Sequence, residues 1–374
     1  MSQTRFIYVA CPWTPKGGGM FKVADYLLQS QLENCAAGYA QLRALDTRGG
    51  GSAGMSFVVL IQAMFTLIKG KLSGELAGVH VNMAERLSLF RKGVIIALCK
   101  ALNIPVVLHL HAAQLHHFYR RLPNLLQGLT RWFFSLANTC VVLGQSSQRF
   151  VIDELHVAPE KVAIVINGVP APELPKKHRS DAKFNLLFLG NLSERKGVSD
   201  LLRALSNPVF DSQHLAVTIA GGGDIAHYQQ LAQQLGIADL VDFTGWADQA
   251  QAAELLSKAD ALILPSYDEG LPLVILEAMA ASVAVICTPV GEIPSVLTDQ
   301  LNACFVTPGD SASITVTIQR LINDPELRLK LQQNGRDVYL REFCMARFFA
   351  NIASIHQQHF GVCAQASKSL TSGL

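Results

Sequence analysis

Two acidic residues lie at the ends of the segment whose residues are most typical of a ligand-binding site. Glu269 ends a loop, and Glu277 is expected about two turns into the apolar helix that follows. Between them, Gly270, Leu271 and Leu273 lie where this helix begins, so their backbone N–H groups can bind an anion. A carboxylate at position 277, among apolar neighbours, is costly to bury without a hydroxyl or cation partner. We therefore interpret the segment as a binding site; the alternative is an acid on the solvated face of the helix.

A pair of cations forms a second candidate site. Arg195 and Lys196 are adjacent in a turn between a strand and a helix, shortly after Gly190, and Gly197 lies where the helix begins. Two fixed cations and the positive end of a helix can hold one phosphate group. The alternative is a solvated turn.

Two glycine-rich loops and one histidine are weaker candidates. Ligands of open parallel α/β sheets bind beyond the carboxyl ends of the strands, so loops that follow strands are the places to search. Gly18 and Gly19 in one such loop, and Gly223 in another, let the backbone approach a ligand closely, although a flexible turn needs the same residues. His111 lies where a strand gives way to a loop, and it is either a ligand contact or a satisfied core residue.

Short β-rich runs alternate with amphipathic stretches of helix length throughout the chain. This alternation predicts βα units, parallel sheets and two doubly wound domains of similar size. Residues 169–180, rich in proline and charge, are interpreted as the linker between them. Residues 324–360 are expected to be helical, with Asp324 as the N-cap. The expected strands are Arg5–Ala10, Gly78–Val81, Pro105–Leu110, Thr139–Leu143, Val162–Ile166, Phe184–Gly190, Leu215–Ala220, Leu240–Thr244, Ala261–Leu264 and Val283–Cys287.

The composition is that of a folded, apolar protein. Of 374 residues, 50% are hydrophobic and 16% are charged, which excludes intrinsic disorder and a small disulfide scaffold. The most apolar segment, residues 57–68, is shorter than the roughly 20 residues that cross a bilayer, and no signal peptide is recognised, so a cytoplasmic location is expected. The eight cysteines include no CxxC pair and are interpreted as core thiols. No Asp-x-Asp motif occurs, and we expect no metal site.

Charge is unevenly distributed although the formal net charge is only +2. Residues 86–152 contain no Asp or Glu, and the region 86–131 interleaves cations with aromatic side chains, which suits an anionic membrane surface. Helix packing with a basic outer face is the main alternative; the absence of a nucleic-acid motif argues against nucleic-acid binding. The residues concerned are Arg86, Arg91, Lys92, Arg120, Arg121 and Arg131, with Phe118, Tyr119, Trp132 and Phe133.

These motifs together resemble a known family. Glu269 and Glu277 form an E-x7-E signature that, with SERKG at residues 193–197 and NGV at residues 167–169, is similar to family 4 of the retaining glycosyltransferases. The resemblance is densest over residues 167–306. It implies an α/β protein of GT-B fold, with two facing Rossmann-like, doubly wound parallel-sheet domains and an interdomain cleft. Residues 1–170, with a crossing helix at about 345–374, would bind the acceptor, and residues 171–344 the nucleotide sugar.

The resemblance also implies roles for the candidate residues. Arg195 and Lys196 would bind the donor diphosphate, Glu277 the ribose hydroxyls, Glu269 the transferred sugar, and His111 would lie by the sugar. The chain departs from many relatives in one respect, because Asn191 follows Gly190 where they have an arginine. The implied catalytic residues are His111, Arg195, Lys196 and Glu269; the implied donor-binding residues are Gly18, Gly19, Gly190, Gly223, Gly270, Leu271, Leu273 and Glu277.

This resemblance thus implies a retaining glycosyltransferase of the hexosyltransferase class. It would use a nucleotide sugar, a UDP- or GDP-sugar, and a saccharide or lipid-linked acceptor in polysaccharide or glycolipid synthesis, at the inner face of the cytoplasmic membrane. Fixed cations stabilise the charge that develops on a departing diphosphate, so neither a metal nor another cofactor is expected. The alternatives are a nucleotide-sugar epimerase or hydrolase of the same fold and a non-catalytic nucleotide-sugar-binding protein. A nicotinamide oxidoreductase is disfavoured because no GxGxxG motif is followed by an acid at the required spacing.

Overall fold

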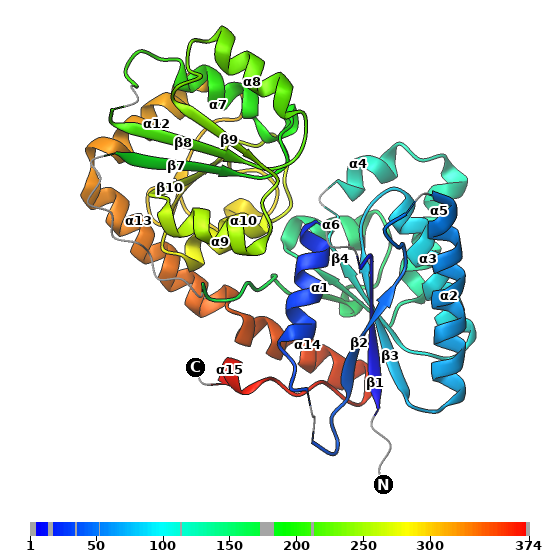
Figure 1. Cartoon of the computed structure of the whole chain (residues 1–374). Coiled ribbons are helices and arrows are strands. Elements are labelled where there is room, and N and C mark those ends of the chain that lie inside the picture. Colours follow the sequence, from blue (N-terminus) through cyan, green and yellow to red (C-terminus); the bar gives the residue numbers. More distant parts are fainter. Residues whose placement is uncertain are drawn as a thin grey trace. The chain divides into compact units, whose positions relative to one another are not determined.

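The chain divides into two compact units, each of which is described by itself (Figure 1). One unit contains Met1–Gly168 and Met345–Leu374, and the other contains Val169–Cys344. The computed structural model describes residues 5–13, 18–33, 36–51, 53–112, 114–172, 183–210 and 213–371, without the side chains of residues 53, 369 and 371. Most of the segment interpreted as the linker, from residue 173 onward, lies outside the described residues.

The first unit is built on a parallel sheet of six strands in the order β2-β1-β3-β4-β5-β6. The strand order reverses between β1 and β3, and such a switch point opens a crevice at the carboxyl ends of the strands. The strands are β1 (Phe6–Cys11), β2 (Gln41–Asp46), β3 (Leu76–Met83), β4 (Val106–Leu110), β5 (Thr139–Val142) and β6 (Val162–Ile164). The helices are α1 (Gly19–Gln29), α2 (Ala53–Leu72), α3 (Leu87–Ala101), α4 (Leu115–Arg120), α5 (Asn124–Leu136), α6 (Gln145–Asp153), η1 (Pro159–Lys161), α14 (Met345–Phe360) and α15 (Lys368–Thr371).

The second unit has its own six-stranded parallel sheet, in the order β12-β11-β10-β7-β8-β9, which reverses between β7 and β10. Its strands are β7 (Phe184–Leu189), β8 (Leu215–Ala220), β9 (Val241–Gly245), β10 (Ala261–Leu264), β11 (Ala284–Cys287) and β12 (Cys304–Phe305). Its helices are η2 (Glu194–Lys196), α7 (Val198–Leu205), α8 (Ile225–Gln234), α9 (Gln249–Lys258), α10 (Leu273–Ala280), α11 (Ile293–Val296), α12 (Ser311–Asn323), α13 (Pro325–Val338) and the π-helical η3 (Tyr339–Phe343).

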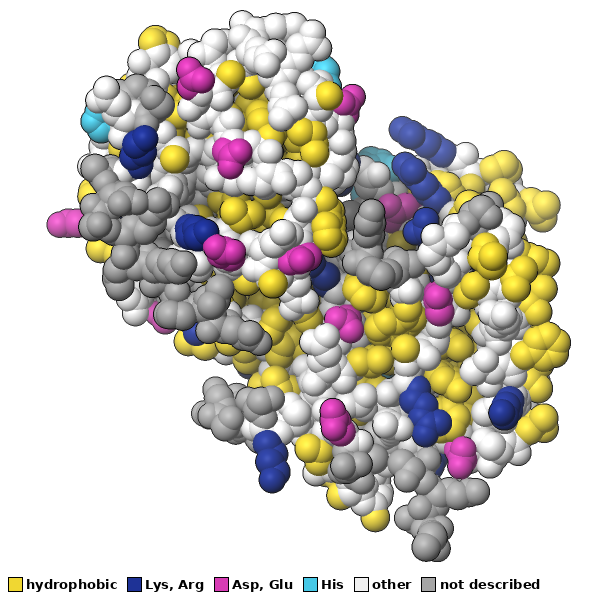
Figure 2. All heavy atoms as spheres, viewed as in Figure 1, with side chains coloured by type: hydrophobic (Ala, Val, Ile, Leu, Met, Phe, Trp, Pro, Cys, Tyr) yellow, Lys and Arg dark blue, Asp and Glu magenta, His cyan; other side chains and the backbone are white. Residues whose placement is uncertain are grey.

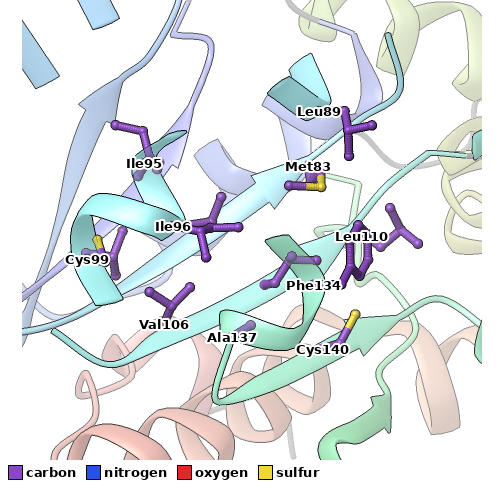
Figure 3. Packing of buried hydrophobic residues seen from close by; sticks show 14 of the residues in the cluster. Met83, Leu89, Ile95, Ile96, Cys99, Val106, Leu110, Phe134, Ala137 and Cys140 are labelled. Atoms are coloured by element: carbon purple, nitrogen blue, oxygen red, sulfur yellow. The ribbon is translucent and has the colours of Figure 1, made fainter. Parts of the chain in front are cut away.

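Helices on the sheet of the first unit bury a continuous apolar core (Figure 3). Met83 of β3 and Leu89 and Ile96 of α3 are completely buried, and each such side chain contributes about 1.5–3 kcal/mol. Gly93 brings α3 close to α5, because a Cβ there would lie 2.2 Å from the ring of Phe133. The packing of this helix therefore depends on the absence of a side chain at position 93.

The last long helix, α14, packs within the first unit. Phe348 and Ile352 are buried, and Phe360 lies against β3 so closely that a Cβ on Gly78 would come within 2.4 Å of its ring. The predicted helical stretch is interrupted at Cys344, which has an extended backbone between η3 and α14. Asp324 caps α13 as predicted, since its side chain accepts a hydrogen bond of 2.9 Å from the backbone N–H of Leu327.

Helix α2 corrects an expectation about the longest apolar segment. The residues from Gly54 to Leu72 are long and apolar enough to cross a membrane, by length and composition alone. Only 28% of the most apolar part of this helix is buried. Leu60, Ala63 and Leu67 form its buried side, which joins the core, so α2 is a surface helix with an apolar outer face.

Candidate functional site

The switch point of the second sheet carries two of the predicted site segments. The loop after β7 contains Arg195 and Lys196, and the loop after β10 contains Glu269. The backbone N–H of Tyr267 donates a hydrogen bond of 2.8 Å to the carbonyl of Arg195, so the two loops are joined. The structure thus brings together residues that lie more than 70 positions apart in the sequence.

Two cations share one buried carboxylate at this place. Lys196 Nζ forms an ion pair with Glu269, and Arg195 Nη1 lies 3.7 Å from Glu269 Oε2 while donating to the carbonyl of Asp268. The side chains of Glu269 and Lys196 are 7% and 13% exposed, whereas that of Arg195 is 41% exposed. The three side chains carry a net charge of +1, so the cluster attracts an additional anion while Glu269 holds the lysine in position.

Glycines fix these loops at short distances from one another. A Cβ on Gly197 would lie 2.1 Å from the carbonyl oxygen of Pro265, and a Cβ on Gly291 would lie 1.9 Å from that of Glu269. Both glycines have positive φ, +70° and +61°, which other residues rarely adopt. The backbone that carries Lys196 and Glu269 is therefore set by packing of loop on loop.

Close contacts between loops also explain the glycines of the loop after β8. A Cβ on Gly221 would lie 1.8 Å from the carbonyl oxygen of Gly190, and a Cβ on Gly223 would lie 2.4 Å from that of Leu192. Contacts between loops thus account for the glycine at position 223, which the sequence analysis assigned to donor binding. At Gly190 the nearest atom to a Cβ is 3.8 Å away, so that glycine is not required by a steric contact.

The start of α10 also differs from the expectation. The helix begins at Leu273, so Glu277 is the fifth helical residue and lies one turn into the helix rather than two. It is partly exposed, whereas Leu271 is 5% exposed and contributes to the core. The N–H groups of the first turn have no helical carbonyl as acceptor, which leaves donors available near Gly270 and Leu273.

Three hydrogen bonds that the sequence did not suggest stabilise the cationic loop. Tyr267 donates a hydrogen bond of 2.8 Å to Asp200 Oδ2. Glu194 accepts hydrogen bonds from Ser199 Oγ at 2.6 Å and from the Tyr228 hydroxyl at 3.1 Å. Burial and the carboxylate of Glu194 raise the pKa of Tyr228 to about 12. The spacing in the sequence gave no signal of these partners, which lie on different elements.

In the first unit, the predicted His111 lies directly after β4 and pairs with a residue of the neighbouring strand. Its Nε2 atom is 2.8 Å from Asn82 Oδ1 at the end of β3. Gly18 and Gly19 lie at the start of α1, where Gly18 is the N-cap. The preceding part of that loop, residues 14–17, lies outside the described residues.

His111 belongs to a group of four histidines. His80 Nδ1 lies 2.8 Å from His356 Nε2, and His80 Nε2 lies 3.2 Å from His109 Nδ1, whose ring centroid is 4.0 Å from that of His111. Burial lowers the pKa of His80 and of His111 to about 3, and burial with the neighbouring imidazoles holds the pKa of His109 and His356 well below the usual value. The imidazole at position 111 is therefore neutral near pH 7.

Part of the region that interleaves cations with aromatic side chains is buried. Lys92 is 0% exposed and donates a hydrogen bond of 2.6 Å to the carbonyl of Asn82. Tyr119 and Phe133 are each 4% exposed and belong to the core, whereas Trp132 is 49% exposed. The period of α3 could have revealed this, because position 92 lies on the same helical face as the buried Leu89 and Cys99.

Thiols and acids are not arranged as metal ligands in the described parts of the chain. Seven cysteines are free there, and five of these are buried; Cys35 lies outside the described residues. No group of three His, Cys, Asp or Glu side chains that could hold a metal ion occurs among the described residues.

Comparison with known families identifies both units. Residues 171–338 match the family model described as glycosyl transferases group 1, and residues 80–171 match the one described as glycosyltransferase family 4. The chain belongs to the group 1 glycosyltransferases of the family 4 type. This confirms the family that the E-x7-E signature and its accompanying motifs indicate.

Curated relatives match the chain in part. A putative glycosyltransferase EpsD of Bacillus subtilis is 32% identical over 52% of this chain and 51% of its own length. The lipopolysaccharide core biosynthesis glycosyltransferase LpsD of Rhizobium meliloti is 30% identical over 49% of this chain and 53% of its own length. A D-inositol 3-phosphate glycosyltransferase of Thermobispora bispora is 27% identical over 60% and 56%. The chain thus spans about half the length of these relatives.

Solved structures confirm the fold class. Sucrose-phosphate synthase from Thermosynechococcus elongatus superimposes with a TM-score of 0.75 at 17% identity, covering 95% of this chain and 98% of its own. HepE from Anabaena, solved in complex with UDP and glucose, superimposes with a TM-score of 0.73 at 18% identity. The match covers 94% of this chain and 99% of HepE. With two six-stranded parallel α/β units, the chain has the predicted GT-B fold.

Proposed function

We propose that this protein transfers a sugar from a nucleoside diphosphate sugar to a saccharide or lipid-linked acceptor, with retention of anomeric configuration. The observation that carries the proposal is the cluster of Arg195, Lys196 and Glu269 at the switch point between β7 and β10. A diphosphate at this cluster would meet two fixed cations that loop packing already holds in place. The proposed donor is a UDP- or GDP-sugar, and Glu277 is the proposed partner of its ribose hydroxyls.

The proposed chemistry is stabilisation of the leaving group. As the bond between the sugar and the diphosphate breaks, negative charge develops on the departing phosphate, and prepositioned cations stabilise it without reorganisation. Lys196 and Arg195 supply this charge, so the reaction is proposed to proceed without a metal ion. Retention would follow from attack by the acceptor on the side of the sugar from which the diphosphate departs. Neutral His111 would contribute a hydrogen bond to the sugar.

The names of the relatives support the acceptor class. One relative is named a lipopolysaccharide core biosynthesis glycosyltransferase, and others are named D-inositol 3-phosphate glycosyltransferases. We therefore propose a role in polysaccharide or glycolipid synthesis.

Nucleotide release from a panel of UDP-, GDP- and ADP-sugars in EDTA, with and without a lipid extract, tests this proposal. Release that requires both one donor and the extract is the expected result. Release of free sugar or an epimer without the extract would instead indicate a hydrolase or epimerase. Tight nucleotide binding with no release in any combination would indicate a non-catalytic binding protein.

An apolar surface on the first unit favours a lipid-linked acceptor. Helices α2, α3 and α5 lie side by side, and Figure 2 shows hydrophobic side chains gathered over this part of the molecule. Cations flank them, because α2 ends with Lys69 and Lys71 and because Arg86 and Arg121 are exposed. We propose that this surface rests on an anionic membrane at its cytoplasmic face. Its exposed apolar residues are Met55, Phe57, Val58, Ile61, Phe65 and Leu72 of α2, Leu87 and Val94 of α3, and Leu125 and Trp132 of α5.

A further inference from the structure

Cations gather at the switch point of the first unit, where nothing in the proposed donor chemistry uses them. Arg91 and Lys92 lie on α3, and Arg48 follows β2. Arg91 interacts electrostatically with each of the other two: burial, with the charge of Arg48, lowers the pKa of Arg91, and burial, with the charge of Arg91, lowers the pKa of Lys92 to about 8. Placing these cations in proximity is unfavourable unless an anion offsets their repulsion.

Asp46 offsets part of this positive charge, and its carboxylate already accepts hydrogen bonds from the backbone. Its carboxylate accepts hydrogen bonds from the backbone N–H groups of Trp13 at 3.3 Å, Arg48 at 2.9 Å and Gly49 at 3.1 Å. The same charge acts on both Arg91 and Lys92. Three cations with this one carboxylate leave a net charge of about +2.

Buried donors without partners lie at the ends of the same strands and on the same helix. Arg91 Nε, Asn82 Nδ2 and Thr47 Oγ1 are buried and have no hydrogen-bond partner in the described structure. Asn82 and Thr47 are 1% and 0% exposed, so bulk water cannot satisfy them. A buried donor without a partner is unfavourable, and a ligand rich in acceptor oxygens would satisfy these three.

His111 and Lys92 fix the orientation of Asn82. The His111 Nε2 atom is 2.8 Å from Asn82 Oδ1, and Lys92 Nζ is 2.6 Å from the backbone carbonyl of Asn82. Both acceptor oxygens of this residue are therefore engaged, and only its Nδ2 donor remains. An acceptor-rich ligand matches that remaining group.

We propose that the carboxyl edge of β1, β2 and β3 binds a phosphate group of the acceptor, either a phosphate monoester or a diphosphate. This inference rests on the proposed transferase function, and it assigns the class of acceptor to the first unit. A phosphate offers several acceptor oxygens and up to two negative charges, which suit the guanidinium, ammonium, amide and hydroxyl groups carried by α3 and by the ends of β2 and β3. The site also lies where the strand order reverses, the usual ligand position in such sheets.

The donor also contains a diphosphate, so the test must distinguish the two units. Binding of inorganic phosphate and of inorganic pyrophosphate is measured by calorimetry on the full-length protein and on Lys196→Ala, which disables the cluster in the second unit. Arg91→Gln and Arg48→Gln are made in both backgrounds. Arg43→Gln, at a residue within β2 whose guanidinium lies over the ring of Phe6, is the matched control because it removes the same charge.

The expected result is a phosphate or pyrophosphate site that persists in Lys196→Ala. A charge-assisted hydrogen bond contributes about 1.5–3 kcal/mol, so Arg91→Gln should weaken this site at least tenfold, while Arg43→Gln leaves it within about twofold. Tighter binding of pyrophosphate than of phosphate would indicate an acceptor with a diphosphate. Tighter binding of phosphate would indicate a phosphate monoester.

Equal affinity in Arg91→Gln, Arg48→Gln and Arg43→Gln would overturn the acceptor-phosphate site, as would loss of all anion binding in Lys196→Ala. Either outcome would leave the proposed transferase function intact if donor-dependent nucleotide release still requires Lys196. Conversely, a persistent anion site in a protein that releases no nucleotide would contradict the proposed function but not the site.

Discussion

The Nζ atom of Lys196 forms an ion pair with the carboxylate of Glu269, which lies 73 residues further along the chain. The two residues follow β7 and β10, the strands between which the order of the sheet reverses. Because glycines hold both loops in place, the cation is positioned before any ligand arrives. Such preorganisation makes an electrostatic contact effective in catalysis, since no energy is spent on rearrangement during the reaction.

Replacement of Lys196 should therefore reduce turnover without unfolding the protein. Removal of one prepositioned donor to a developing anion typically costs about 2.7–4 kcal/mol, so Lys196→Ala should lower kcat roughly 100- to 1000-fold. Turnover is measured by nucleotide release, and folding by circular dichroism. Lys258→Ala, on α9 with a 40% exposed side chain, is the control and should turn over normally. Near-normal kcat in Lys196→Ala would refute the role of this residue.

A second prediction separates glycines that packing requires from glycines that it does not. Gly221→Ala would place a Cβ 1.8 Å from the Gly190 carbonyl oxygen at a φ of +154°, whereas the nearest atom to a Cβ on Gly222 is 3.6 Å away. Gly221→Ala should therefore destabilise the second unit by about 2 kcal/mol or more, and lower its Tm by roughly 4–8 °C. Gly222→Ala is the adjacent control. Equal melting temperatures for the two variants would show that the loop contact is unimportant.

The buried histidines predict loss of stability in acid. In the unfolded chain a histidine has a pKa of about 6.5, whereas the folded-state pKa of His80 and of His111 is about 3. Between these values the unfolded state binds protons that the folded state does not, so stability should fall as the pH decreases from about 6.5 toward 3. Urea unfolding of the first unit at several pH values in this window measures the slope.

One substitution isolates the contribution of the histidine group to that slope. His356→Gln removes a titrating ring but retains a polar partner for His80 Nδ1, so unfolding should depend less steeply on pH than in the wild-type protein. His227→Gln is the same substitution at an exposed residue of the second unit, and it should leave the slope unchanged. If the two variants behave alike, buried imidazoles are not the cause of the acid sensitivity.

The sequence predicted the parts of each site that lie in loops after strands, because the alternation of strand and helix fixes where those loops must be. It did not predict β2, since Gln41–Asp46 contains only two buried residues and lies at the edge of the sheet. An edge strand that is buried on one side at few positions shows little of the apolar pattern by which strands are recognised.

Residues that depend on contacts between distant elements were also missed. His80 and His356 lie 276 positions apart, and no spacing in the sequence relates them. Lys92 is among the cations expected at a membrane surface, yet it is buried, because the end of β3 offers it a carbonyl acceptor. Burial of such groups depends on the partners that the fold supplies, which residue type alone does not reveal.

The apolar face of α2 gives the final prediction, on membrane association. Phe65 is 68% exposed, and burial of such a side chain in a membrane contributes about 1.5–3 kcal/mol, so Phe65→Glu should reduce co-flotation with anionic liposomes by tenfold or more. Val316→Glu adds the same charge at a residue of the second unit that is 64% exposed, and it should float like the wild-type protein. Since cations flank the α2 face, neutral liposomes should bind more weakly than anionic ones. Absence of flotation for the wild-type protein with either lipid would rule out this membrane surface and leave the apolar face of α2 to a different partner.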